Sequence, residues 1–424
     1  MKIAIIGSGI SGLSAAWLLY QKHEITVFEQ NDYIGGHSNT VQAQDMPAVD
    51  TGFIVFNDWT YPNLIALLDH INVPTEPSDM SFGVSMNNGA YEYSSDALFA
   101  QTANYFQPAH LLMLSSLIRF YKQAQKDLDF DGTLGDYLKE KAYGKSFIER
   151  HIAPMAAAIW SANPETILSF PFQTFVNFFV NHGLFILNTK VRPKWHTVTG
   201  GSRSYVKALS APFKDRIKLN LNIKKIIRHT DFVELIDIHG NTHRFDQVIL
   251  AGHSDQSLRI LSDASEDEKQ VLSSIPYSEN RAVLHTCADL MPKRRAAWAS
   301  WNVLLHPERP PILTYWMNRL QSFIDQEQDL FVTLNADVPA KHVHYETVYH
   351  HPHYTLEALK GWNKIKDIQG VRRTWFCGAW TGYGFHEDGL SSGLAVAEMV
   401  GGVKRPWSVS EEKSIAAENV RAAA

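Results

Sequence analysis

Apolar runs and short polar breaks alternate over residues 1–30 in the pattern of a βαβ unit. Residues 2–6, KIAII, form one short apolar run, and residues 25–28, ITVF, form a second. A helical apolar stretch over 14–20 separates them. Runs that are apolar throughout are typical of strands covered on both faces. We therefore predict two parallel strands joined by a helix.

Two later regions carry the same kind of signal. Residues 216–254 are rich in strand formers, with a predicted hairpin at HGN, residues 239–241, and a buried strand in QVILAGH, residues 247–253. Near the C-terminus a short apolar strand, TWFCGAW, precedes a helical pattern that we expect to begin near Ser391 or Ser392. These separated segments fit one nucleotide-binding domain.

The pattern thus predicts an α/β fold with a discontinuous Rossmann-like domain and an interleaved α+β domain rich in aromatic residues. The predicted boundaries are 1–79, 196–274 and 356–403 for the nucleotide-binding domain, 80–195 and 275–355 for the second domain, and 404–424 for a flexible tail.

The two most apolar stretches of the second domain are residues 106–121 and 175–187. Polar residues interrupt both, and neither reaches the roughly 18–20 apolar residues that span a bilayer. We interpret them as buried helices or as a surface that rests on a membrane.

Composition narrows the classes of function. The 424 residues are 45% hydrophobic and carry a net charge of -5, which argues against nucleic acid as a partner. Two cysteines are too few for a disulfide framework and fit a reduced, cytoplasmic protein.

The first strand runs into a glycine motif, G-x-G-x-x-G, at Gly7, Gly9 and Gly12. The first glycine permits the tight turn, the second lets backbone approach a pyrophosphate, and the third lets helix and strand pack closely. Glu29 ends the second strand, where a carboxylate takes ribose hydroxyls. Gly35 and Gly36 provide a second close approach, which favours the larger FAD over NAD.

The segments GSGISG, IGGH and FCGAWTGYGFHEDGL, together with Glu29, resemble the flavin-containing amine oxidoreductase superfamily, which includes monoamine oxidase, protoporphyrinogen oxidase and phytoene desaturase. VDTGFIVFN, PMAAAIWS, NHGLF and TGGSRSYV further resemble bacterial FAD-binding proteins associated with cyclopropane-fatty-acid-synthase-like methyltransferases. The resemblance implies the GR2, or amine-oxidase, type of FAD domain, with FAD held non-covalently.

The resemblance also implies contacts, residue by residue. The pyrophosphate would contact the first loop, the ribose would contact Glu29, and the adenine would contact the backbone of Ile223. The implied contacts are Gly7, Ser8, Gly9, Ile10, Ser11, Gly12, Glu29, Gly35, Gly36, His37, Ile223, Gly378, Ala379, Gly389, Leu390 and Ser391, the last five beside the ribityl chain and flavin ring. Many members have arginine where this chain has His37, so a pyrophosphate contact there would be weaker or pH-dependent.

Two residues are candidates for catalysis. His285 stands in a strand pattern where relatives often place a lysine; it could act as a base, although a hydrogen-bonded structural histidine is the commoner interpretation. Arg203 would either face the flavin cavity or form a surface pair. The histidines in KHVHYETVYHHPHY alternate like a strand and bring no further ligand set, so we expect no metal.

Leu390 stands where amine oxidases place an aromatic cage residue, which weakens the amine interpretation. The leading hypothesis is therefore hydride removal from a small apolar substrate such as a fatty acyl or modified acyl chain. A flavin amine oxidase, a redox-neutral isomerase, and a non-catalytic flavin-binding partner of a lipid methyltransferase stay as alternatives. The location would be cytoplasmic or peripheral to the inner membrane, and the oligomeric state stays open.

Overall fold

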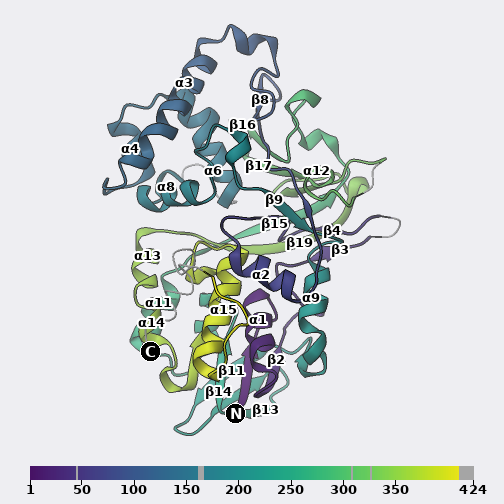
Figure 1. Cartoon of the computed structure of the whole chain (residues 1–424), viewed down its shortest axis with the longest axis vertical. Helices are drawn as coiled ribbons and strands as arrows, with labels where there is room; N and C mark the ends of the chain where they lie inside the picture. Colours follow the sequence, from purple (N-terminus) through teal and green to yellow (C-terminus); the bar gives the residue numbers. More distant parts are fainter. Residues whose placement is uncertain (44–45, 161–166, 307–308, 325–326, 410–424) are drawn as a thin grey trace.

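The computed structural model describes residues 1–43, 46–160, 167–306, 309–324 and 327–409. The chain forms two halves stacked along its long axis, with both ends of the described chain in the lower half (Figure 1).

The lower half is built on a five-stranded parallel sheet whose strands come from all three segments predicted for the nucleotide-binding domain. In spatial order its strands are β10 (Ile217–Lys218), β2 (Glu24–Phe28), β1 (Lys2–Ile6), β14 (Gln247–Leu250) and β20 (Thr374–Phe376). Every predicted strand of this sheet is confirmed. The interior of β1 and β14 is fully buried, which explains their uniformly apolar sequences.

A three-stranded antiparallel sheet accompanies the parallel one and contains the predicted hairpin at HGN. It consists of β11 (Ile223–Arg228), β12 (Val233–Asp237) and β13 (Thr242–Phe245). The helices of the lower half are α1 (Ile10–Leu19), α2 (Pro62–His70), α9 (Arg203–Ser210), α10 (Ser254–Ile260), α11 (Glu266–Ser273), α13 (Leu356–Trp362), α14 (Ile365–Ile368) and α15 (His386–Gly401).

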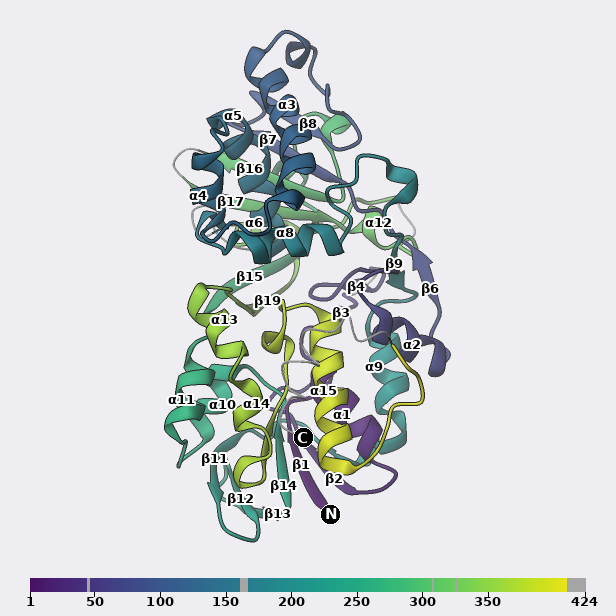
Figure 2. The same cartoon turned by 60° about the vertical axis from the view of Figure 1, so that its left-hand side comes forward.

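The upper half packs helices against a seven-stranded mixed sheet (Figure 2). In spatial order its strands are β19 (Val343–Pro352), β15 (Tyr277–His285), β18 (Phe331–Leu334), β17 (Arg309–Trp316), β16 (Trp301–His306), β7 (Phe82–Met86) and β8 (Tyr91–Ser94). Its helices are α3 (Pro108–Gln123), α4 (Leu134–Glu140), α5 (Lys145–Phe147), α6 (Ala153–Trp160), α8 (Phe172–Asn181) and α12 (Met317–Leu320). The histidine-rich segment is the strand β19, as its alternation predicts.

Short strands and a buried carboxylate connect the halves. The short strands are β3 (Thr40–Val41), β4 (Val49–Asp50), β5 (Phe56–Asn57), β6 (Thr75–Pro77) and β9 (Trp195–Val198). Asp50 accepts hydrogen bonds from Ser202 N at 3.0 Å, Thr40 Oγ1 at 2.5 Å and Gln321 Nε2 at 2.6 Å. Because Gln321 directly follows α12, this carboxylate ties the upper half to the start of α9.

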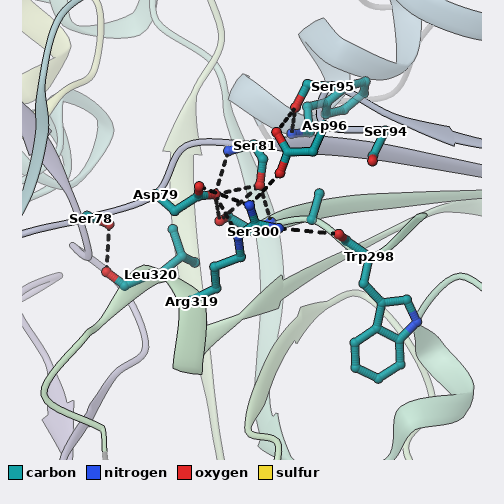
Figure 3. A network of polar contacts seen from close by, with 12 residues as sticks. Ser78, Asp79, Ser81, Ser94, Ser95, Asp96, Trp298, Ser300, Arg319 and Leu320 are labelled. Atoms are coloured by element: carbon teal, nitrogen blue, oxygen red, sulfur yellow. Dashed lines mark hydrogen bonds and ion pairs between the residues drawn. The ribbon is translucent and has the colours of Figure 1, made fainter. Parts of the chain in front are cut away.

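A second polar network fixes one edge of the upper sheet (Figure 3). Arg319 of α12 pairs with Asp79, at 3.1 Å from Nε to Oδ1, and with Asp96. Asp79 also accepts from Ser81 N and Oγ and from Ser300 Oγ. The network holds together the segments that flank β7, β8 and β16.

The two apolar stretches of the upper half differ in their burial. One face of α8 is buried, as expected of a core helix. The buried-helix interpretation is wrong for most of α3, where only His110, Met113, Phe120 and Tyr121 are buried. No helix of the described residues has both the length and the apolar character needed to cross a bilayer.

The chain beyond α15 also differs from expectation. We predicted a tail that frays from residue 404, yet Arg405 forms an ion pair with Glu398 at 2.7 Å and Trp407 stacks on Trp17. Residues 403–409 are called the C-terminal strap below, and residues 410–424 lie outside the described part of the chain.

Candidate active site

The first glycine loop forms an open cradle at the end of β1. Gly7 has a φ of +106°, which only glycine adopts readily, and its N–H donates to Phe28 O at 2.8 Å. An added Cβ on Gly12 would lie 2.0 Å from Gly7 O, so α1 packs directly on the loop. A Cβ on Gly9 would meet no atom within 4 Å. The loop is therefore closed on the protein side and open toward a ligand, as a pyrophosphate requires.

Glu29 lies beside this loop and is 5% exposed. One carboxylate oxygen accepts from Ser8 N at 2.9 Å and Ser8 Oγ at 2.6 Å, and the other from Asn31 N at 2.9 Å. A carboxylate offers about four acceptor positions. Two of these positions hold the first loop through Ser8 and one accepts from Asn31. One position is left for a ribose hydroxyl.

The second glycine loop lies against the first. Gly35 forms a parallel bridge with Gly9, and its N–H donates to Ser8 O at 3.0 Å. A Cβ on Gly36 would lie 3.2 Å from Gly9 Cα. The structure thus brings together both loops that the sequence assigned to the dinucleotide.

His37 follows that loop and belongs to a group of partly buried rings. Its ring centroid lies 4.8 Å from Tyr349, 5.7 Å from His351 and 6.1 Å from His253. Burial lowers the pKa of His37 to about 4, so the imidazole is neutral at pH 7. Neutral His37 can donate a hydrogen bond to a phosphate but lacks the charge of the arginine found in many relatives.

Ile223 is the first residue of β11 and is buried. Gly378 and Ala379 follow β20, and Gly378 N donates to Ser392 Oγ at 3.0 Å. These positions lie on the same half of the molecule as the glycine loops.

The helix that closes the site begins at His386, so the start predicted near Ser391 or Ser392 is wrong. Asp388 produces the earlier start: its carboxylate accepts from Phe385 N at 2.9 Å and caps the first turn. Ser391 and Ser392 lie inside the helix and are fully buried. The free N–H groups of α15 therefore belong to the turn that carries Glu387 and Asp388.

Gly389 and Gly393 have a packing role. An added Cβ would lie 2.9 Å from Ile10 Cγ2 at Gly389 and 2.2 Å from Ser11 O at Gly393. Glycine at both positions lets α15 lie directly on the first turn of α1. Leu390 is fully buried in the hydrophobic core rather than exposed on a wall.

The two catalytic candidates lie apart from this assembly. His285 is fully buried: Cys287 N donates to Nδ1 at 3.0 Å, so Nε2 carries the proton that bonds Thr333 Oγ1 at 2.6 Å. With both nitrogens engaged, His285 has no free lone pair for a substrate proton. Arg203 begins α9 with an exposed side chain that donates to Gln42 Oε1 at 3.0 Å. These contacts favour a structural role for His285 and a surface pair for Arg203.

A cavity of about 250 Å³ lies between the start of α2, the end of α8 and the segment that leads into α15. Its wall carries five aromatic side chains and an imidazole, with two carboxylates at one side. These lining residues are Trp59, Tyr61, Phe178, His182, Tyr383, Phe385, Glu387 and Asp388. The sequence placed most of them in motifs but assigned none of them a role.

Glu387 is the most constrained of these residues. Its carboxylate accepts from Asn63 N at 2.9 Å, Asn63 Nδ2 at 2.8 Å and Leu64 N at 2.9 Å. These are free donors at the N-terminus of α2, so Glu387 caps that helix from outside. Burial raises its pKa to about 7, and burial together with Glu387 raises the pKa of Asp388 to about 7.

Neither carboxylate forms an ion pair with a lysine, arginine or histidine of the described residues. The sequence motifs did not indicate a role for Glu387 or Asp388, because acidic residues in a glycine-rich turn do not form a recognisable motif by themselves. The signal available in the sequence was the pair of adjacent acids at a helix start. In the described part of the chain, no group of three or more metal-ligating side chains gathers.

The residues present fit FAD. The open face at Gly9 adjoins Glu29, which Ser8 contacts, and the second loop, which pairs with Gly9. Both cysteines are buried and free, and burial raises the pKa of the Cys377 thiol, which disfavours the thiolate a covalent link would need.

Comparison with known proteins agrees with a flavin cofactor. The family model of flavin-containing amine oxidoreductases matches residues 10–285. A candidate flavin-containing monoamine oxidase of Mycobacterium tuberculosis is 25% identical over 239 residues, 54% of this chain and 51% of that protein. A 4,4'-diapophytoene desaturase of Staphylococcus aureus is 23% identical over 282 residues, 59% of this chain and 54% of that protein. The chain is thus matched over about half the length of these curated relatives.

Among solved structures, a CLA-producing fatty acid isomerase from P. acnes superimposes with a TM-score of 0.65 at 16% identity, over 94% of this chain and 97% of that one. At that identity the likeness concerns the fold. The family model covers well over half of the chain and includes Gly12, Glu29, the second glycine loop and the hairpin. The chain therefore belongs to the flavin-containing amine oxidoreductase family, whose cofactor is FAD.

Proposed function

We propose that this protein is an FAD-dependent oxidoreductase that removes a hydride from an apolar substrate held in the cavity between α8 and α15. The position of the cavity carries the proposal, because the segment that leads from the flavin-side motif into α15 also forms one cavity wall. FAD, when bound, supplies the hydride acceptor. The protein must place the reacting carbon roughly 3–3.5 Å from it.

The cavity wall suits an apolar substrate that reacts away from water. Phe178 stacks on Phe385 with ring centroids 4.9 Å apart, which closes the wall between α8 and the start of α15. Phe178 and Phe385 meet as parallel faces, so the contact leaves little room for solvent. Excluding water protects a hydride transfer from side reactions.

An acyl chain is our first choice of substrate. Phe178 and Val180 of α8 line the cavity, and an alkyl chain needs only apolar contact with them. The named activities of two similar proteins, a carotenoid-precursor desaturase and a fatty acid isomerase, lend support by analogy.

A hydrophobic amine is the second candidate, and a separate observation favours it. Glu387 and Asp388 are buried beside aromatic rings and have no cationic partner among the described residues. Buried carboxylates are usually paired, and aromatic faces attract ammonium groups. An amine substrate would supply the missing positive charge.

Anaerobic reduction of the holoprotein separates these candidates. Dodecylamine and methyl dodecanoate are matched in chain length, and loss of the oxidised-flavin absorbance reports hydride transfer. Bleaching by the ester alone supports the acyl substrate, and bleaching by the amine alone supports the amine. A shifted double bond without bleaching, with an unsaturated ester, would indicate isomerisation. If neither compound reduces the flavin or is converted by the protein, the result would contradict the proposal and favour a non-catalytic partner role.

A further inference from the structure

His182 occupies an unusual position in the cavity wall. It follows the last residue of α8, is 8% exposed, and lines the cavity. Its Nδ1 lies 2.9 Å from Phe178 O. A carbonyl oxygen can only accept, so Nδ1 carries the proton of the neutral ring. Nε2 therefore keeps a lone pair, and no hydrogen bond from a described residue reaches it.

Stacking holds the ring in this orientation. The imidazole lies on Phe178 with centroids 3.9 Å apart and planes 29° apart. Phe385 and Trp195 lie at centroid distances of 5.5 Å and 6.4 Å. The hydrogen bond of Nδ1 fixes one edge of the ring and the stack fixes its plane. Nε2 is therefore already positioned, and ligand binding does not have to pay the entropy of ordering the ring.

The imidazole stays neutral under ordinary conditions. Burial lowers the pKa of His182 to about 4. Its lone pair is thus present throughout the neutral range, and the ring cannot act there as a cation toward Glu387 or Asp388. Whatever the protonation of those two carboxyl groups, Nε2 of the neutral His182 ring stays a hydrogen-bond acceptor, so a ligand gains by bringing a donor to it.

We infer that His182 Nε2 is the acceptor for an O–H or N–H group on the otherwise apolar ligand of this cavity. The inference rests on the proposed function only in taking the cavity as the substrate site. An acceptor that a bound ligand covers without pairing costs free energy, so a ligand without a donor is disfavoured even when its shape fits. Within the proposed substrate classes, His182 thus favours a compound that carries a hydroxyl or amino group, such as a hydroxylated acyl chain or an amine, over the same chain without a donor.

The test measures equilibrium binding to the oxidised holoprotein, without turnover. Octanol and heptyl methyl ether have the same heavy atoms, but only octanol has a donor. Trp59 lines the cavity and Trp195 stacks on His182, so tryptophan fluorescence reports binding, with calorimetry as a check. Octanol should bind wild-type protein roughly tenfold more tightly than the ether.

His182→Phe keeps the ring stack but removes Nε2, and should bring the preference for octanol close to unity. The fold should survive, because Phe178 O still accepts from the backbone N–H of residue 182 at 3.0 Å. His182→Gln restores an acceptor and should restore part of the preference. His196→Phe is the matched control, since His196 stacks on Phe56 outside the cavity lining.

Equal affinity of wild-type protein for both ligands, absence of binding by either, or a preference retained in His182→Phe would overturn the inference. Because no turnover is measured, a donor preference in a protein that no substrate reduces would leave the inference standing and contradict the proposed function alone. A holoprotein that a substrate reduces, but that does not prefer octanol to the ether, would contradict the inference and leave the proposed function standing.

Discussion

At the scale of single residues, the carboxylates at the start of α15 differ most from what the sequence suggested. Glu387 caps α2 from outside and Asp388 caps α15, so both are structural and both face the cavity. Their raised pKa values have a consequence for stability. An acid whose pKa is higher in the folded state binds more protons there than when unfolded.

The contribution of Glu387 to the free energy of unfolding should therefore fall as pH rises from about 4.5 to about 7, its ordinary and folded pKa values. Buried histidines with lowered pKa values, such as His37 and His182, contribute in the opposite direction, so the effect is read as the difference between wild type and Glu387→Gln. Glu387→Gln should shift the slope of stability against pH toward more positive values, both by removing one titration and by lowering the pKa of Asp388, to which Glu387 contributes. Urea denaturation between pH 5 and pH 8 measures the slope.

Glu266→Gln is the control for this prediction. Glu266 is exposed and pairs only with Lys269 on the surface, so this variant should keep the wild-type slope. A Glu387→Gln protein whose stability depends on pH just as the wild type does would contradict the raised pKa.

At the scale of elements, the contact of α15 with α1 decides the geometry of the flavin side. Gly393→Ala would place a Cβ 2.2 Å from Ser11 O and 2.4 Å from Ser14 Oγ, which forces the helices apart. We expect a loss of about 2–3 kcal/mol in stability and weaker FAD binding, because Ser11 is part of the first loop. Thermal unfolding and FAD titration of the apoprotein measure the two effects.

Gly144→Ala provides the comparison, since a Cβ there meets nothing within 4 Å and the residue has a φ of -76°. That change should cost less than about 1 kcal/mol and leave FAD affinity unaltered. Equal behaviour of the two variants would argue against close packing of α15 on α1.

The C-terminal strap acts on the cavity through Asn63. Arg405 Nη1 and Trp407 Nε1 donate to Asn63 Oδ1 at 2.8 Å and 3.0 Å, while the amide nitrogen of Asn63 donates to Glu387. Arg405 is 6% exposed in its pair with Glu398. Arg405→Met should lower stability by about 2 kcal/mol, measured by urea denaturation.

Arg259→Met tests whether this loss is specific to the strap. Arg259 pairs with Asp255 on the surface at 72% side-chain exposure and should contribute little. If Arg405→Met were as stable as Arg259→Met, the strap would not support α2 and α15.

At the scale of the whole molecule, α3 lies at the end of the upper half far from the nucleotide site (Figure 1), and several apolar side chains on and beside it form an exposed patch. Phe106 is 81% exposed and Leu112 61% exposed, with Leu111 and Ile118 on the same helix. Such a protruding apolar patch is typical of a surface that dips into lipid headgroups. The membrane-resting interpretation of residues 106–121 therefore stays a prediction, now confined to this patch.

The protein should sediment with vesicles of phosphatidylethanolamine and phosphatidylglycerol. Phe106→Ser with Leu112→Ser should reduce that binding at least tenfold, because each buried apolar side chain contributes about 2 kcal/mol. Ile238→Ser removes an apolar residue that is 50% exposed in the lower half and should leave binding unchanged. A membrane role for α3 would be contradicted if the control variant also lost sedimentation, or if the double variant sedimented as well as the wild type.

The sequence by itself determined the parallel sheet, the hairpin and the two glycine loops. Each depends on local chemistry: uniformly apolar runs, a turn motif, and a φ of +106° at Gly7 that favours glycine. The position of Glu29 at the end of the second strand also came from the sequence, while family resemblance added the expected contacts at Ile223 and on the flavin side.

Only the tertiary structure decided which side chains share a cavity and which are used up elsewhere. The lone pair of His285 accepts from Cys287 N and its N–H bonds Thr333 Oγ1, while the lone pair of His182 stays available, and no spacing in the sequence distinguishes the two. The reason is physical: the role of a buried polar group depends on partners that come from distant elements. Glu387 meets α2 more than three hundred positions earlier in the chain, where only the folded molecule can bring them together.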